Sequence, residues 1–240
     1  MVLAKESDIL HKFQLQQLLI AVVDDQYLSR HSYFKGGTCA EMSGFLDRFS
    51  VDLDFDIIGE IDEKKFRSHV GKITKRLDLI DDNKNKESLF FNFKYKAPTN
   101  QRNKLKFSFF QNTVVSNIYE TRFLPEINRT VNCQTVETMF ANKLVTPIDR
   151  HERHNEVEAR DIYDICYFFS QGYEFNAEII KERTGLETKI YIKKLIDFIK
   201  KKVTEDMINQ DLNMLLPLEK FTKIRKTLKQ DTLLYLRNLI

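Results

Sequence analysis

The first half of the chain alternates between helical and strand-like hydrophobic patterns. Apolar residues recur at helical spacing over residues 4–29 and, after Asp62 as an N-cap, over residues 63–80. Residues 50–57 alternate instead, with apolar side chains on one face and Ser50, Asp52, Asp54 and Asp56 on the other. Further strands are predicted at residues 33–35, 88–96, 103–111 and 126–132, with a polar turn at residues 81–86.

The second half shows helical patterns only. From Gln134 onward, helices are predicted over residues 135–146, 156–170, 177–183 and 187–200, and from Pro217 to residue 240. Pro147 is expected to end the first of these helices and Gly172 the second. The pattern therefore predicts an α+β fold in two parts, an α+β domain at residues 1–133 and a helical domain at residues 134–240.

Composition narrows the class of protein. In 240 residues, 42% are hydrophobic and 30% charged, which is typical of a globular protein with a large core rather than of a disordered chain. Three scattered cysteines form no CxxC pair, and no signal layout or membrane-length apolar run is present. We therefore expect a reduced, cytoplasmic protein without a membrane partner. A net charge of +3 does not by itself indicate nucleic-acid binding.

A glycine turn is predicted between the short strand at residues 33–35 and the helix expected at residues 38–46. Gly36 and Gly37 allow a tight turn and a close backbone approach, and Thr38 is expected to cap the following helix. Exposed N–H groups at such a helix start favour an anion, for example a phosphate.

The alternating strand supplies a row of carboxylates beside this turn. Same-face positions on a strand lie about 6.5–7 Å apart, so Asp52, Asp54 and Asp56 repel one another unless water, a base or a cation intervenes. Mg²⁺ is bound in proteins by one or two carboxylates together with substrate phosphates. The turn and the strand together favour a metal-and-phosphate site over the alternative, an amphipathic strand with one solvated face.

Two positions of the helical half stand out. Lys143 continues the apolar stripe of Val136 and Phe140, and a buried ammonium must be paired unless it reaches solvent past the helix end. Asp161 and Asp164 lie one turn apart on the next helix, where surface carboxylates would show the same spacing. His151 and His154 lack a helical i, i+4 register and a third matched ligand, so a polar loop is expected there rather than a metal site.

Together these segments resemble the AbiEii/AbiGii toxins, which belong to the DNA polymerase β-like nucleotidyltransferase superfamily and form type IV-like toxin–antitoxin pairs. The resemblance rests on F-K-G-G-T at residues 34–38, R-F-S-V-D-L-D-F at residues 48–55, F-A-N-K-L at residues 140–144 with the downstream Arg150, and R-D-I-Y-D-I at residues 160–165. The glycine turn with Asp-x-Asp is shared across the superfamily. The lysine followed by Arg-Asp-x-Tyr-Asp is more particular to the toxins.

The resemblance implies a bilobed molecule, with nucleotide and metal held on a mixed sheet and a helical lobe closing the cleft. It implies that Asp52 and Asp54 bind the metal, that Gly36, Gly37 and Thr38 bind the triphosphate, and that Ser50 lies close by. It implies an essential Lys143 and an essential Asp161, supported by Asp164 and Arg160. Many superfamily members carry a third carboxylate on the next strand, and here its expected positions hold Lys106 and Ser108.

The function so implied is transfer of a nucleoside monophosphate from an NTP, with Mg²⁺ or Mn²⁺, to an acceptor hydroxyl. The resemblance points to the 3′ end of tRNA as acceptor, to growth inhibition as the outcome and to an antitoxin as partner. Basic residues around residues 193–202 and 220–237 are consistent with an RNA-binding surface or with a solvated amphipathic helix. Two alternatives remain: a protein or small-molecule acceptor, and a catalytically silent interaction module.

Overall fold

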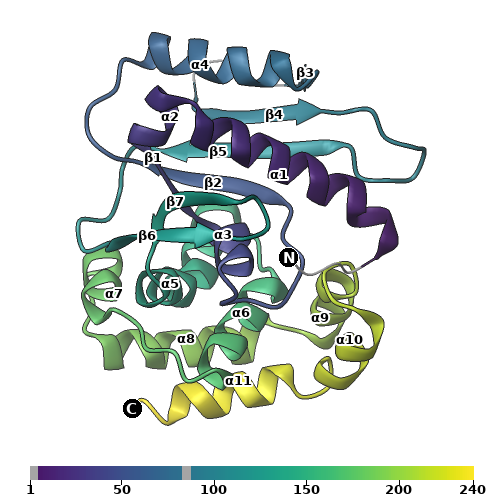
Figure 1. The fold of residues 1–240 in the computed structure, drawn as a ribbon. Helices are drawn as coiled ribbons and strands as arrows, with labels where there is room; N and C mark the ends of the chain where they lie inside the picture. Colours follow the sequence, from purple (N-terminus) through teal and green to yellow (C-terminus); the bar gives the residue numbers. More distant parts are fainter. Residues whose placement is uncertain (1–4, 83–87) are drawn as a thin grey trace. The chain divides into compact units, whose positions relative to one another are not determined.

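The structure, a computed structural model, describes residues 5–82 and 88–240 (Figure 1). The chain forms two compact units. The first, called the sheet unit, consists of Met1–Thr113 and Tyr119–Gln134, and the second, called the helical unit, consists of Val114–Ile118 and Thr135–Ile240. Strands in one unit and helices in both confirm the predicted α+β class. The turn predicted at residues 81–86 lies mostly outside the described residues.

A mixed sheet organises the sheet unit. Its described strands run in the order β3-β4-β5-β2-β1-β7-β6. The pairs β2–β5 and β1–β7 are parallel and the other neighbours are antiparallel. The bounds are Ser32–Lys35 for β1, Asp52–Ile57 for β2, Ile80–Asp81 for β3, Phe90–Lys94 for β4, Lys104–Phe110 for β5, Tyr119–Leu124 for β6 and Arg129–Gln134 for β7.

One face of this sheet is an aromatic core. Phe55 of β2 stacks on Phe34 of β1 at 5.2 Å between ring centroids and on Phe109 of β5 at 5.3 Å. Phe66 of helix α4 meets Phe109 edge to face at 4.7 Å. Since side chains alternate along a strand, the aspartates of β2 lie on the opposite face. The strict alternation predicted for residues 50–57 is therefore present.

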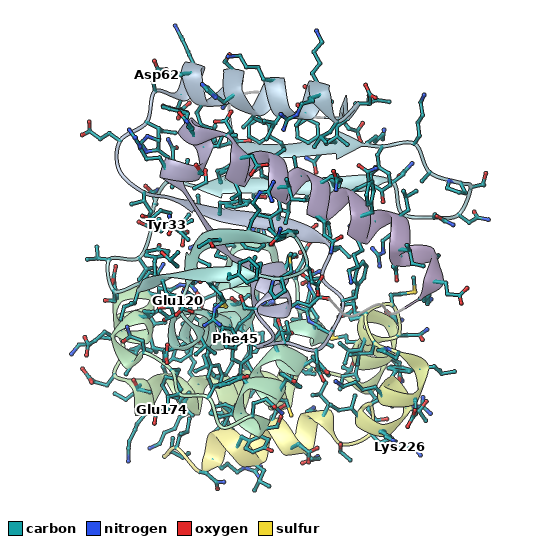
Figure 2. All side chains as sticks on the ribbon, viewed as in Figure 1. Tyr33, Phe45, Asp62, Glu120, Glu174 and Lys226 are labelled. Carbon is teal, nitrogen blue, oxygen red and sulfur yellow. The ribbon has the colours of Figure 1, made fainter. Side chains whose placement is uncertain are left out.

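The helices of the sheet unit correct one prediction. The helix expected over residues 4–29 is divided at Asp25, whose backbone is extended and whose carboxylate accepts from the N–H groups of Tyr27 and Leu28. Asp25 thus ends one helix and caps the next, as Asp residues commonly do. The elements are a 3₁₀ turn at Glu6–Asp8, α1 at Ile9–Asp24, α2 at Gln26–His31, α3 at Gly36–Met42 and α4 at Glu63–Arg76. Asp62, labelled in Figure 2, caps α4 as predicted.

The strand predicted at residues 126–132 is wrong in its bounds. Residues 125–128 form a turn in which Asn128 adopts a positive φ of 50°. The turn joins β6, which the sequence pattern did not reveal, to β7. β6 was missed because neither face is uniformly apolar: Tyr119, Thr121 and Phe123 alternate with Glu120, Arg122 and Leu124.

Helices make up the described part of the helical unit. They are α5 at Val136–His154, α6 at Ala159–Ser170, α7 at Ala177–Thr184, α8 at Thr188–Lys202, α9 at Glu205–Leu212, α10 at Leu218–Ile224 and α11 at Leu228–Arg237. The prediction missed α9 and joined α10 to α11. Residues 114–118 belong to this unit because Glu182 accepts from the N–H groups of Val115 and Ser116 at 2.6 and 2.8 Å.

Pro147 does not end its helix, contrary to prediction. A proline has no N–H for the carbonyl one turn earlier and clashes with it, which normally kinks or breaks a helix. α5 nevertheless continues through Pro147 to His154, and Asn155 closes it with a φ of 55°. Near the proline, the Tyr191 hydroxyl donates to Leu144 O at 3.1 Å and the Thr146 hydroxyl to Asn142 O at 2.8 Å.

No helix within residues 5–82 and 88–240 is both long and apolar enough to cross a lipid bilayer.

Candidate active site

The glycine turn lies directly against the acidic strand. Gly36 has a φ of 80°, and a Cβ atom placed on it would lie 2.8 Å from Asp54 Oδ2. A Cβ on Gly37 would lie 2.8 Å from Ser50 Oγ and 3.2 Å from Arg48 Nη2. Only glycine fits both positions, since real Cβ atoms do not approach that closely. The structure thus brings together four residues that the sequence predicted as one site, namely Gly36, Gly37, Ser50 and Asp54.

Thr38 does not cap helix α3, contrary to the prediction. Helix α3 begins at Gly36 with Lys35 as its N-cap, so Thr38 is already inside the first turn and does not cap the helix. Its buried hydroxyl donates to the backbone carbonyl of Asp52. Thr38 therefore fixes the start of the acidic strand against α3.

Asp52 and Asp54 differ in surroundings from Asp56. Asp52 is partly exposed, and its carboxylate makes no hydrogen bond or ion pair with a residue that the structure describes. Asp56 is 1% exposed and receives three donors, from Lys35 Nζ at 2.6 Å, Gln134 Nε2 at 2.7 Å and the Tyr119 hydroxyl at 2.9 Å. The predicted row of three carboxylates therefore contains two that are partly exposed and one that is buried and neutralised internally.

Buried polar groups hold the loop between α3 and β2. Glu41 accepts from the backbone N–H of Ser50 at 3.1 Å, and Arg48 donates to Phe49 O at 3.0 Å. Both charged side chains are almost fully buried. Neither was predicted as a site residue, although Arg48 was part of the quoted motif. A charged residue inside the otherwise apolar or small sequence of α3, as Glu41 is, was the available signal.

His11 supports the same strand from helix α1. Its Nε2 donates to Val51 O at 2.9 Å, and its Nδ1 lies 2.7 Å from the Tyr95 hydroxyl. Burial lowers the pKa of His11 below its ordinary value, against the raising effect of the Val51 carbonyl. Burial also raises the pKa of Tyr95 to about 12. The His11 ring, whose lowered pKa favours the neutral form, thus anchors Val51, the residue before Asp52.

The donor set fits a hard divalent cation. Asp52 and Asp54 lie on one face of β2, where their carboxylate oxygens are of the type that Mg²⁺ prefers, and the backbone of Gly36 closely approaches Asp54. Within residues 5–82 and 88–240, no group of three or more His, Cys, Asp or Glu side chains is placed to hold a metal ion. The remaining ligands of such a cation would therefore come from substrate oxygens and water.

In the helical unit the predicted site residues form ion pairs. Lys143 Nζ lies 2.7 Å from Asp164 Oδ2, and Asp164 is 0% exposed. Asp161 is also buried and accepts from Arg150 Nε at 3.0 Å. Arg160 pairs with Glu158 rather than with either aspartate. The structure therefore pairs Lys143 with Asp164, so that its ammonium is neutralised as burial requires.

Arg150 is a site-region residue that was quoted in the motif but not assigned a role. Burial lowers its pKa, but the charges of Asp161 and Glu158 outweigh burial and raise the pKa above its ordinary value. Arg150 and Asp161 lie on different helices, so no periodic pattern in the sequence indicates that they are in contact.

The histidines of residues 151–154 lie in the last turn of α5, not in the predicted loop, because the helix passes Pro147. His151 packs against Phe198 at 5.4 Å. The described residues around them form no metal-binding group.

Comparison with known proteins identifies the family. The model of the family "Nucleotidyl transferase AbiEii toxin, Type IV TA system" matches residues 17–235. The chain belongs to the AbiEii toxin nucleotidyltransferases. Among curated proteins none matches the sequence.

Two solved structures share the AbiEii fold of this chain. One is a Helicobacter pylori protein assigned as a nucleotidyltransferase, with a TM-score of 0.57 and 20% identity, covering 98% of this chain and 99% of that one. The other is JHP933 from Helicobacter pylori, with a TM-score of 0.51 and 20% identity, covering 98% and 95%. At this identity they show the fold alone.

Membership in the AbiEii family confirms the resemblance drawn from four short motifs. It makes the chain a nucleotidyltransferase toxin of a toxin–antitoxin system, a family that uses an NTP. The match extends well beyond the motifs, from within α1 to within α11.

Proposed function

We propose that this toxin transfers a nucleoside monophosphate from an NTP, with Mg²⁺ or Mn²⁺, to a hydroxyl at the 3′ end of a tRNA in the cytoplasm. The observation that carries the proposal is the contact between the glycine turn and the acidic strand. The backbone of Gly36 lies directly against Asp54 and that of Gly37 against Ser50, so N–H groups that can bind phosphate lie beside a carboxylate that can bind the cation.

The sheet unit would hold the nucleotide. Asp52 and Asp54 are the proposed ligands of the divalent cation, which when bound would neutralise charge on the triphosphate. The backbone N–H groups of Gly36 and Gly37, with the Ser50 hydroxyl beside them, would hold phosphate oxygens. Thr38 contributes by fixing Asp52 through its backbone carbonyl.

The reaction is an in-line displacement at the α-phosphorus. The acceptor hydroxyl releases its proton to solvent and forms the new P–O bond, the bond from the α-phosphorus to the oxygen of the β-phosphate breaks, and pyrophosphate leaves. Lys143 is proposed to stabilise phosphoryl oxygens as a point charge, with Asp164 orienting it at 2.7 Å. Since Arg150 donates to Asp161, we assign Asp161 a positioning role rather than that of the proton acceptor. Arg160 remains a proposed nucleotide contact.

Part of the basic surface of the helical unit is available to an RNA backbone. Lys194, Lys200 and Lys223 are paired with acidic side chains, and Lys229 donates to Val203 O at 2.7 Å. Burial against aromatic rings lowers the pKa of Lys220. The cations that take part in no ion pair with described residues include Lys193, Lys201, Lys202, Lys226 and Arg237. Lys226 is labelled in Figure 2. Such a surface is smaller than the sequence predicted but still supports phosphate contacts.

One labelling experiment tests the proposal. The purified toxin is incubated with Mg²⁺, total cell RNA, total cell protein and each of the four α-³²P-labelled NTPs in turn, with the Asp54→Asn variant as control. We expect label in the tRNA fraction with the native chain only. Label in protein would contradict the tRNA acceptor, and equal labelling by the variant would contradict the site. Co-expression with a neighbouring antitoxin gene is expected to relieve growth inhibition.

A further inference from the structure

A lysine stands beside the first aspartate of the acidic strand. In the parallel pairing of β2 with β5, Asp52 lies opposite Lys106 and Asp54 opposite Ser108. Paired residues of neighbouring strands point to the same face of a sheet. The next residue, Phe107, packs on Phe55 at 5.8 Å on the aromatic face, which confirms that Lys106 shares the face of Asp52.

The charge of Lys106 is available at this position. Lys106 is exposed, and it forms no ion pair or hydrogen bond with a residue that the structure describes. Lys104, two residues earlier on the same face, lies 3.8 Å from Asp82. Lys106 thus differs from Lys104: the acidic residue that lies opposite Lys106 on the neighbouring strand is Asp52.

The third carboxylate of the face cannot take part in binding a second cation without breaking a buried network. Asp56 already accepts from Lys35, Tyr119 and Gln134. Lys35 is further fixed by the Phe110 ring, 4.0 Å from its Nζ. Two cations about 3.5–4 Å apart need carboxylates that bridge and flank them. This face offers Asp52 and Asp54 for that purpose, with an ammonium and a hydroxyl on the adjoining strand.

We propose that the sheet unit binds one divalent cation with its nucleotide, and that the Lys106 ammonium supplies the second positive charge on that face. The inference rests on the proposed function, because it assumes that Asp52 and Asp54 hold the cation of an NTP. A lysine suits this role because it is a compact point charge on a flexible stem and needs no ligand set of its own. It would contact the triphosphate from the β5 side, opposite the glycine turn.

Counting bound Mn²⁺ tests the inference without measuring transfer. The full chain is titrated with MnCl₂ at saturating α,β-methylene analogue of each NTP, and bound ions are counted by electron paramagnetic resonance after subtraction of Mn²⁺ on free analogue. We expect one Mn²⁺ per chain. Lys106→Met should keep one ion but weaken binding of the Mn²⁺–analogue complex about tenfold, and Lys106→Arg should restore most of that loss.

Matched variants control for fold and for charge in general. Lys104→Met removes a lysine from the same face and strand and is expected to leave binding unchanged. Lys106→Met combined with Ser108→Asp adds a carboxylate beside Asp54 and should raise the count from one ion to two. Thermal unfolding of each variant verifies that it is folded.

The outcomes separate this inference from the proposed function. Two Mn²⁺ ions on the native chain, an unchanged affinity in Lys106→Met, or a double variant that still binds one ion would each overturn the inference. In the first two cases the nucleotide site itself would stand. If the native chain binds no Mn²⁺–analogue complex at all, the proposed function fails and the inference fails with it.

Discussion

The two units of this toxin use aspartate in opposite ways. In the sheet unit, the carboxylates of Asp52 and Asp54 are partly exposed on the same face of β2. In the helical unit, Asp161 and Asp164 are buried and each accepts from a basic side chain. Removing the partner of a buried carboxylate destabilises the fold, whereas a partly exposed carboxylate can contact a bound cation. The same residue type is therefore expected to respond oppositely to substitution.

The largest effect is expected at Asp52. Asp52→Asn should lower the rate of nucleotidyl transfer at least about a thousandfold, because the carboxylate that binds the cation is lost. The free energy of unfolding should stay within about 0.5 kcal/mol, since no described partner is left unpaired. Transfer assays and urea denaturation measure the two quantities. Glu60→Gln, an exposed position of the same unit, is the control. If Asp52→Asn lost stability but still transferred nucleotide, Asp52 would have a structural role rather than a role in the reaction.

Removing the cation of the buried pair should act on stability. Lys143→Met removes the ammonium that lies 2.7 Å from the buried Asp164 carboxylate, and the free energy of unfolding should fall by about 3–5 kcal/mol. Lys143→Met with Asp164→Leu should recover most of this stability by removing both charges. Transfer should remain low in both variants, because Lys143 is also proposed to contact the phosphate. A stable single variant would show that the pair contributes little to the fold.

The glycine turn offers a matched comparison of strain and space. Gly36 and Gly44 have φ values of 80° and 79°, but a Cβ on Gly44 meets nothing within 4 Å. Gly44→Ala should therefore cost only about 1–2 kcal/mol of backbone strain and leave activity intact. Gly36→Ala has the same strain and also forces Asp54 aside, so transfer should fall about a hundredfold. Equal activity in the two variants would show that Asp54 does not need its present position.

The smallest effect concerns the helix that carries Lys143. Tyr191→Phe removes the donor to Leu144 O near Pro147 and should lower the free energy of unfolding by about 1 kcal/mol. Burial raises the pKa of Tyr191, consistent with a neutral hydroxyl that donates. Tyr235→Phe is the control, because its hydroxyl has no hydrogen bond among described residues. Equal denaturation midpoints for the two variants would rule out this role of Tyr191.

Local patterns grouped the residues of the candidate site in the sheet unit. The alternation of residues 50–57 and the Gly-Gly turn are set by neighbours in sequence, so Asp52, Asp54, Gly36, Gly37 and Ser50 could be grouped from the sequence. The neutralisation of Asp56 could not be predicted, because its three partners lie 21, 63 and 78 residues away in the sequence. The same holds for β6, which is defined by its pairing with β7 rather than by its own sequence pattern.

The role of the acidic strand itself is tested by isothermal titration calorimetry. The experiment measures how tightly a Mn²⁺–NTP analogue complex binds to the native chain and to Asp54→Asn. If Asp52 and Asp54 hold the cation against the triphosphate, the native chain binds the complex and the variant loses at least about a hundredfold in affinity, while both unfold at the same temperature. Equal affinity of the two folded proteins for the complex would contradict the proposal that Asp52 and Asp54 hold the cation.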